Sequence, residues 1–227
     1  MQYTIPVENK LIISDDWGSE LIFYTGDVKM ITRKVLDTHV FHGSLNLFCD
    51  DPTRNSYFIP HGKGVLYTDI DNKIKYGDVN FIDGVLHGYC TIYDDKTDCI
   101  MYEGDFKNNK PDGFGKLYNH SVKDEEYVIY EGDWKDGMRS GVGYSHEVVS
   151  EIYDGEWENN MRNGYGQHFM DNQIIACIWK NNKKNGYGQI ELVDKGRYVI
   201  NCKWKDDKIV EPGIEVIPVR KSKRTNN

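Results

Sequence analysis

The sequence is poor in cysteine and proline and contains no long apolar segment. Its 227 residues include 5 Cys and 6 Pro. The cysteines are widely spaced and form no Cys-x-x-Cys pair, so neither a zinc knuckle nor a disulfide framework is predicted. No apolar run approaches the ~20 residues that span a bilayer, and residues 1–6 lack the basic and apolar regions of a signal peptide. We therefore expect a cytoplasmic protein whose membrane contact, if it has any, is peripheral.

Positive charge is also in deficit, because 28 Lys and Arg face 36 Asp and Glu, which gives a formal net charge of -8. General nucleic-acid binding needs a net basic face, so no nucleic-acid partner is predicted. Aromatic residues and glycine are abundant, with 16 Tyr, 8 Phe, 5 Trp and 22 Gly. Disordered chains are depleted in aromatics, so the chain is expected to fold. A repeat array suits this balance, because each repeat buries only a thin strip against its neighbours.

Four segments of the sequence fit one template. An aromatic residue is followed by Gly two positions on and by Phe or Trp four positions on. A Gly-x-Gly pair then begins 11 residues after the first position in all four segments (102 to 113, 130 to 141, 153 to 164 and 175 to 186). The structural repeat positions are Tyr102, Gly104, Phe106, Gly113 and Gly115; Tyr130, Gly132, Trp134, Gly141 and Gly143; Tyr153, Gly155, Trp157, Gly164 and Gly166; and Trp179, Gly186 and Gly188. In the fourth segment Ile175 and Cys177 replace the first Tyr and Gly, so this repeat is expected to pack differently.

Each segment has the pattern of a β-hairpin. Positions i, i+2 and i+4 share one strand face, so Tyr130 and Trp134 lie on a packed aromatic face and Glu131 and Asp133 on a solvated acidic one. The six residues that follow each first strand are rich in Asn, Asp and Gly, which turns require. These turns are expected at residues 107–112, 135–140, 158–163 and 180–185. Glycine weakens a strand, so the Gly-x-Gly pair indicates a ring packed close against bare backbone.

The pattern weakens toward both ends, as terminal repeats must face water on one side. Residues 62–67 resemble a second strand whose first strand we expect at residues 41–45, and residues 24–28 resemble a first strand without an assigned partner. We predict an N-terminal cap at 1–20, degenerate repeats at 21–101, the regular array at 102–204, a C-terminal cap at 205–219 and a basic, disordered tail at 220–227.

The template resembles the MORN repeat (membrane occupation and recognition nexus), which has Tyr-x-Gly-x-Trp/Phe, a short turn and Gly-x-Gly. The match is specific over residues 102–188 and looser over 76–204. The resemblance implies an all-β fold, an elongated single-layer antiparallel sheet of tandem β-hairpins with a shallow groove, in about seven to eight units. In this family the array binds or positions, and any enzyme is a separate domain. We therefore predict no catalytic residue, no cofactor and no small-molecule substrate.

Other motifs favour ordinary structural roles. His39, His42, Cys49 and His61 lack the tight ligand pairs of a structural zinc site, so no metal is predicted. The Gly-Lys-Gly at residues 62–64 lacks the second half of a phosphate-binding loop. Without a signal peptide, the sequon at residues 119–121 is expected to stay unmodified. The basic residues at 220–224 leave open a disordered end, a nuclear-import patch and an anionic-lipid anchor.

A basic residue recurs at nearly the same point of each expected turn. These residues are Lys110, Arg139, Arg162 and Lys184, the candidate partner-binding residues. With two strands per repeat, each ~4.8 Å from the next, they would lie about 10 Å apart along one edge. Turn residues are also often basic for solubility, so a solvated edge is the simpler interpretation. The leading functional hypothesis is a protein-interaction scaffold with another protein as partner, and the alternative is a peripheral membrane adaptor that binds anionic phospholipids.

Overall fold

The computed structural model describes residues 2–5, 11–14, 21–32, 56–69, 74–94, 96–119, 127–148, 151–192, 198–212 and 217–218. These residues form β-strands and turns, with no helix among them. The chain divides into two compact units, the first made of residues 1–127 and 135–137 and the second of residues 128–134 and 138–227. The predicted all-β architecture of antiparallel hairpin repeats is confirmed.

The first unit is an antiparallel sheet in which most strands pair with their neighbours in sequence. Its strands are β1 (Gln2–Ile5), β2 (Leu11–Ser14), β3 (Leu21–Thr32), β4 (Ser56–Asp69), β5 (Ile74–Ile82), β6 (Val85–Leu86), β7 (Gly88–Tyr93), β8 (Ile100–Lys107) and β9 (Lys110–Asn119). The twelve-residue β3 pairs with β1, β2 and β4.

The β3–β4 pair corrects one expectation from the sequence. Gly26 of β3 lies opposite Gly64 of β4, in the same way as Gly104 lies opposite Gly115. The first strand that belongs to residues 62–67 is therefore β3, whose Gly26 supplies the close backbone pairing, and the expected partner at residues 41–45 lies outside the described residues.

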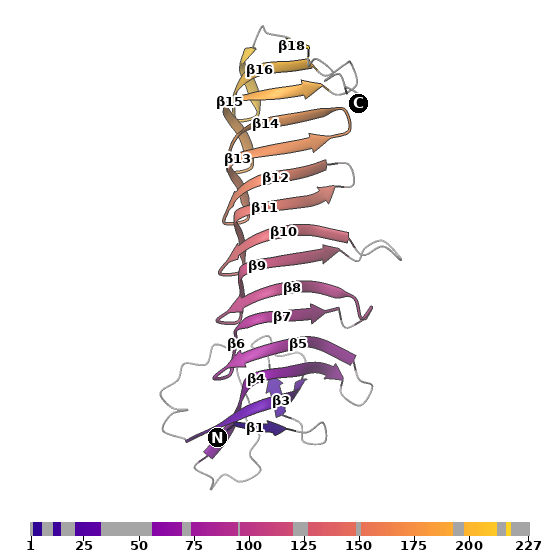
Figure 1. Cartoon of the computed structure of the whole chain (residues 1–227), viewed down its shortest axis with the longest axis vertical. Helices are drawn as coiled ribbons and strands as arrows, with labels where there is room; N and C mark the ends of the chain where they lie inside the picture. Colours follow the sequence, from indigo (N-terminus) through magenta and orange to yellow (C-terminus); the bar gives the residue numbers. More distant parts are fainter. Residues whose placement is uncertain are drawn as a thin grey trace, which may run out of the picture. The chain divides into compact units, whose positions relative to one another are not determined.

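The second unit repeats the hairpin in regular order, as the orange and yellow part of Figure 1 shows. Its strands are β10 (Tyr127–Lys135, of which residues 128–134 belong to this unit), β11 (Met138–Val148), β12 (Glu151–Glu158), β13 (Met161–Met170), β14 (Gln173–Lys180), β15 (Lys183–Leu192), β16 (Tyr198–Lys205), β17 (Lys208–Pro212) and β18 (Ile217–Pro218). From β11 to β17 each strand pairs antiparallel with the next, and β18 pairs with β16.

The hairpin turns contain two residues. Both have positive φ, for example 50° at Asn159 and 67° at Asn160. Two successive positive φ values define a type I′ turn, whose twist matches that of the flanking strands. The six-residue turns expected at 107–112, 135–140, 158–163 and 180–185 were therefore wrong. Only the Asn, Asp or Gly pair needs the left-handed conformation, and the residues on either side continue the strands.

The second residue of each turn forms hydrogen bonds with the hairpin that precedes it. Asn160 donates its backbone N–H to the carbonyl of Arg139 at 3.0 Å, and its Oδ1 accepts the N–H of Arg139 at 2.7 Å. Asn182 makes the same pair of bonds with Arg162, at 3.0 and 2.7 Å. In the first unit, Asn109 bonds to Leu86 in the same way. These turn residues hold successive hairpins in register along one edge.

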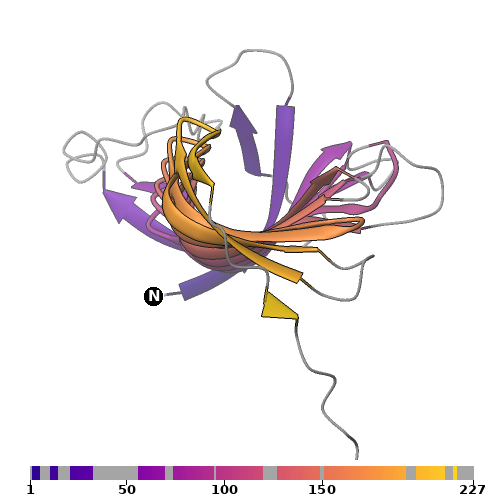
Figure 2. The same cartoon turned by 90° about the horizontal axis from the view of Figure 1, so that it is seen from above.

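The core of the second unit is a strip of aromatic rings on one face of the sheet. Tyr130 packs edge-on against Trp157 at 5.4 Å between ring centroids, and Tyr153 packs against Trp157 at 5.2 Å and Trp179 at 5.4 Å. Tyr130 and Tyr153 are 0% exposed, and Trp134 and Trp157 are also buried. The prediction that the two tryptophans belong to one buried strip is confirmed. The strands of this unit bend into a trough, as Figure 2 shows. We assign the rings to its concave side, because they are buried although the sheet is a single layer, and side chains converge on a concave face.

The two glycines of each Gly-x-Gly pair have different roles. A Cβ on Gly166 would lie 2.3 Å from the hydroxyl oxygen of Tyr153, so this glycine accommodates the ring, as the sequence predicts. Gly164 has a φ of +107°, and a Cβ there would meet the carboxylate of Glu156. It belongs to a bulge, because the register between β12 and β13 shifts between Gly155 and Trp157.

The fourth repeat fills its core with a different pair of side chains. Ile175 and Cys177, which stand in place of Tyr and Gly, are both buried, and Cys177 is 0% exposed. Without a tyrosine ring over the first-strand backbone, there is room for the thiol. Burial raises the pKa of Cys177 to about 11. The thiol is therefore protonated at neutral pH and serves as a packing residue, and the expected difference in packing is confirmed.

Candidate interaction surface

The predicted basic row lies in strands and reaches over the aromatic strip. Arg139 belongs to β11, Arg162 to β13 and Lys184 to β15. Because these residues follow the turns, they pair with the first strand of their hairpin, as Arg162 does with Trp157 and Lys184 with Trp179. Their backbone N–H groups are the ones that Asn160, Asn182 and Asp207 bind. A basic residue therefore recurs at the position whose backbone binds the turn of the next hairpin.

The basic side chains of the second unit are held against the rings. The Arg139 guanidinium lies 4.4 Å from the centroid of the Trp157 ring, and Arg162 lies 4.8 Å from that of Tyr153. Lys184 lies 5.5 Å from the Trp179 ring and 3.6 Å from a carboxylate oxygen of Asp207. All three residues are half-buried, whereas Lys110, in the first unit, is exposed. A cation over an aromatic face is stabilising, so the row helps to cover the core.

The acidic residues of the other face also have structural partners. Asp133 accepts the backbone N–H of Val142 at 3.0 Å, and Glu156 accepts that of Tyr165 at 2.9 Å. Each carboxylate therefore satisfies a donor that the bulge after the first glycine leaves without a strand partner. The sequence predicts only that these acidic residues face solvent. The structure shows in addition that they accept backbone hydrogen bonds.

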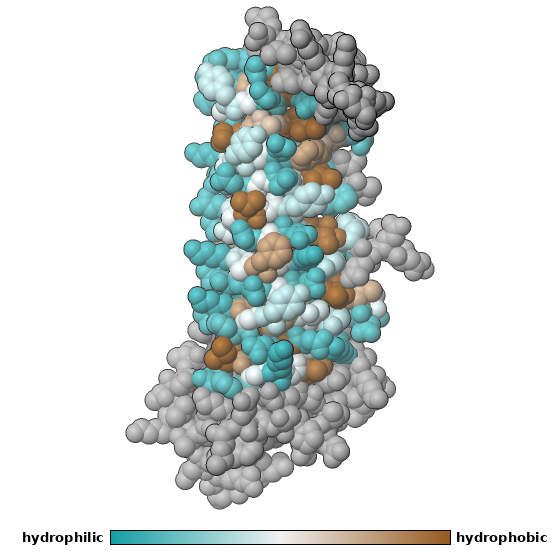
Figure 3. All heavy atoms as spheres, in the orientation of Figure 1, coloured by the Kyte–Doolittle hydropathy of each residue, from teal (hydrophilic) through white to brown (hydrophobic). Residues whose placement is uncertain are grey.

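Three strongly exposed apolar side chains of the second unit lie on this outer face. They occupy the middle position of Gly-x-Gly, with Val142 60%, Tyr165 50% and Tyr187 68% exposed. On the side of the molecule that Figure 3 shows, apolar residues, in brown, lie among hydrophilic ones. Sequence reasoning missed these residues, although a signal exists: the middle residue precedes the glycine that faces the tyrosine ring, so its own side chain points to the other face of the strand.

The outer face differs at the fourth repeat, where Ile178 takes the place of the carboxylate. The equivalent residues are Asp133 and Glu156 in the second unit. Ile178 is 44% exposed and lies directly opposite Tyr165, with the bulge that carries Tyr187 on its other side. Tyr165, Ile178 and Tyr187 thus place exposed apolar side chains on the neighbouring strands β13, β14 and β15.

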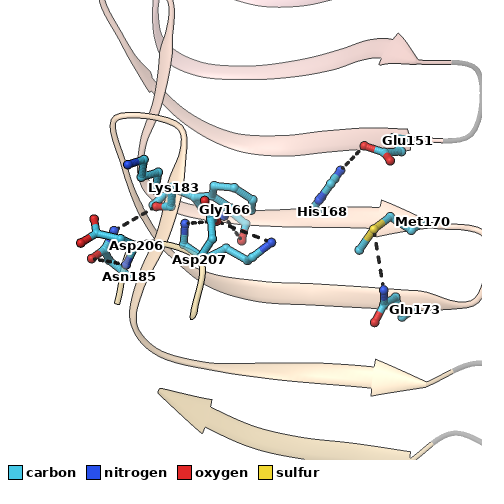
Figure 4. A network of polar contacts seen from close by, with 11 residues as sticks. Glu151, Gly166, His168, Met170, Gln173, Lys183, Asn185, Asp206 and Asp207 are labelled. Atoms are coloured by element: carbon cyan, nitrogen blue, oxygen red, sulfur yellow. Dashed lines mark hydrogen bonds and ion pairs between the residues drawn. The ribbon is translucent and has the colours of Figure 1, made fainter. Parts of the chain in front are cut away.

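A histidine is buried on the inner face. His168 is 7% exposed, and its Nε2 lies 3.1 Å from a carboxylate oxygen of Glu151 on the neighbouring strand (Figure 4). Loss of hydration lowers the pKa of His168, and the charges of Arg162 and Lys184 lower it further, while Glu151 acts in the opposite direction. The imidazole is therefore held in its neutral form, at a position that Leu117 and Ile190 occupy in other repeats.

We expect His168 to make folding of the second unit sensitive to acid. Its pKa in the folded state lies below the ordinary value of 6.5. The stability that it contributes is therefore complete above the pKa of the unfolded chain and is lost as the pH falls through the lower folded-state pKa. Urea unfolding at about pH 7.5 and about pH 5 should show a larger loss of stability in the parent than in His168→Leu. Equal losses would show that His168 does not couple folding to pH.

Of the four residues considered as metal ligands, only His61 lies within the described residues. His39, His42 and Cys49 lie outside the described residues, and His61 Nδ1 lies 3.1 Å from a carboxylate oxygen of Asp83. The part of the chain that the structure describes holds no group of three or more His, Cys, Asp or Glu residues suited to a metal ion. Within the same residues, no helix has the length and apolar character to cross a membrane. The basic tail at 220–227 also lies outside the described residues.

Type I′ hairpins, stacked in chain order and tied by their turn residues, define a β-hairpin repeat protein. The family model described as MORN repeat matches residues 102–119, 130–144, 153–169 and 178–197. The chain is a MORN repeat protein. MORN repeats are a non-enzymatic family that takes part in protein or membrane interactions. No curated protein matched the chain.

Proposed function

We propose that this MORN repeat protein is a non-catalytic scaffold that binds another protein through the outer face of its second unit. The observation that carries the proposal is the row of Val142, Tyr165 and Tyr187, each at least half exposed on successive repeats. Aromatic residues are the side chains most often found at the centre of protein interfaces. The rings of the inner face are already packed against one another, so they offer a partner less surface.

The alternative is a peripheral adaptor that binds anionic phospholipids. The observation in its favour is the register of Arg139, Arg162 and Lys184 along one edge of the sheet. Against it, the side chains already lie over rings, and the protein carries a formal charge of -8, which an anionic membrane repels. The scaffold is therefore the better supported function.

Two sets of variants separate these functions. The outer-face set is Val142→Ser, Tyr165→Ser and Tyr187→Ser, and the edge set is Arg139→Gln, Arg162→Gln and Lys184→Gln. We expect the outer-face set to reduce recovery of cross-linked partner proteins from a lysate of the source cells, with the edge set close to the parent. The stability of each variant is measured by urea unfolding as a control.

The second measurement is co-sedimentation with vesicles of phosphatidylserine and phosphatidylcholine at low and physiological salt. Salt-sensitive binding that the edge set alone abolishes would replace the scaffold by the membrane adaptor. Partner recovery that the outer-face set leaves unchanged would contradict the outer face as the binding surface.

A further inference from the structure

The patch around Ile178 has a pattern of charges that is complementary to itself. Reading across the strands on the outer face, Glu156 lies on β12, Tyr165 on β13, Ile178 on β14, Tyr187 on β15 and Lys203 on β16. We call these five residues the Ile178 stripe. Its centre is apolar, its neighbours on both sides are tyrosines, and its two ends carry opposite charges.

The outer positions of β12 and β16 extend this difference in charge. On β12 they are Asp154, Glu156 and Glu158, which alternate with the inward-facing Tyr153 and Trp157. On β16 they are Asn201, Lys203 and Lys205, which alternate with the buried Cys202 and Trp204. Part of the positive charge is already paired, because Lys203 lies 2.9 Å from Glu211. Lys205 is exposed on the same strand, so the end at β16 remains less acidic than the end at β12.

We propose that the Ile178 stripe binds the same stripe of a second copy of this chain, with the order of the strands reversed between the two copies. This arrangement is called antiparallel below. The inference rests on the proposed outer-face function and names the occupant of that face. A two-fold axis that runs along β14 reverses the order of the strands, so Tyr165 meets the second copy's Tyr187 and Ile178 meets the second copy's Ile178. The acidic β12 of each copy then meets the lysines of the other copy's β16.

The other simple arrangement is excluded by charge. A two-fold axis along the succession of strands would place β12 against β12 and β16 against β16. The carboxylates of Asp154, Glu156 and Glu158 would then face their own copies, and like charges in contact oppose association. A second copy with reversed strand order is therefore the partner that the stripe fits. Contiguous exposed apolar patches commonly mark such binding sites.

The curvature of the sheet sets the strength of this contact. The strands of the second unit bend across their length (Figure 2), so the outer face is convex in that direction. Two convex faces touch along a narrow line that follows the succession of strands, as the stripe does. From β12 to β16 this line covers four strand spacings, or about 19 Å. A contact of this length that is only about one side chain wide buries less than the ~800 Å² per partner of a standard interface, so a reversible, concentration-dependent dimer is expected.

Sedimentation velocity of the purified full chain over a broad concentration series tests the proposal. The parent should shift from monomer to dimer, and Ile178→Glu should weaken dimerisation about tenfold or more, as charge enters the centre of the contact. This variant should fold normally, because the other repeats carry a carboxylate at the same position and Ile178 is 44% exposed. Ile209→Glu is the matched control, because Ile209 lies on β17 outside the stripe and is 48% exposed, so the same charge enters a similarly exposed isoleucine. A parent that stays monomeric, or an Ile178→Glu variant that dimerises like the parent, overturns the proposal.

A charge exchange tests the antiparallel arrangement. Glu158→Lys and Lys205→Glu should each weaken the dimer, and the double variant should restore it, because each new lysine then faces a new glutamate of the other copy. The two positions are four strands apart within one chain, so they do not pair within it. Failure of the double variant to recover overturns the arrangement. If the parent is monomeric but still recovers a different protein from the lysate, the self-association proposal is wrong. The proposed scaffold function is then still supported.

Discussion

Replacing Trp157 by alanine is expected to destabilise the second unit by about 3–5 kcal/mol, the usual range for deleting a large buried aromatic residue. Trp157 is 4% exposed and lies between Tyr130 and Tyr153, with ring centroids 5.4 and 5.2 Å away. Its indole N–H donates a hydrogen bond to the carbonyl of Gly143 at 3.0 Å, and the Arg139 guanidinium covers the ring at 4.4 Å. The substitution therefore opens a cavity, removes a buried donor and uncovers the core of two repeats together.

Hydrogen exchange is the measurement best suited to this prediction, because a repeat array need not unfold in a single step. The loss of protection should be largest in β11, β12 and β13, which surround the site. Trp157→Phe is a matched variant, since Phe106 occupies the equivalent position in the first unit, and it should lose less protection. A Trp157→Ala chain whose protection resembles that of Val142→Ala, an exposed substitution, would contradict the prediction.

The hairpins of the second unit could be predicted because their physical cause is local. The alternation of Tyr130, Gly132 and Trp134 assigns them to one strand face, and the constant spacing to Gly141 fixes the second strand. The structure places these residues as expected, with both aromatics buried. Local rules were less informative at β3, because its partner is separated from it by a long connection, and the sequence gives no register across such a distance.

The site residues could be predicted less well, because their positions depend on contacts between repeats. The composition of residues 158–163 indicates a turn, but only the backbone shows that Asn159 and Asn160 alone have positive φ. As a result Arg162 lies in a strand and covers the ring of Tyr153 instead of projecting from a turn. The exposure of Tyr165 and Ile178 depends on the bulge and on cross-strand register, neither of which the template specifies.

The contact between Tyr153 and Gly166 can be tested by adding a single methyl group. In the folded backbone, a Cβ on Gly166 would lie 2.3 Å from the hydroxyl oxygen of Tyr153 and 2.5 Å from the ring carbon that carries it. The ring has little freedom to move, because it is 0% exposed and its hydroxyl donates to the carbonyl of Glu156 at 3.0 Å. Gly155, directly opposite, leaves no space on the other strand, since a Cβ there would lie 2.4 Å from the Cα of Gly166.

Gly166→Ala is therefore expected to destabilise the second unit by about 3 kcal/mol, near the upper end of the usual range for overpacking a core. This loss should occur although alanine restricts the unfolded chain more than glycine does, an effect that alone would be stabilising. Urea unfolding measures the loss, and a double-mutant cycle with Tyr153→Ile assigns it. The fourth repeat has Ile175 at the equivalent position, so isoleucine is a natural replacement for the ring. If the ring is the obstacle, Gly166→Ala should be less destabilising in the Tyr153→Ile background. An equal effect in both backgrounds, or a single variant as stable as the parent, would show that Gly166 is not required by the tyrosine.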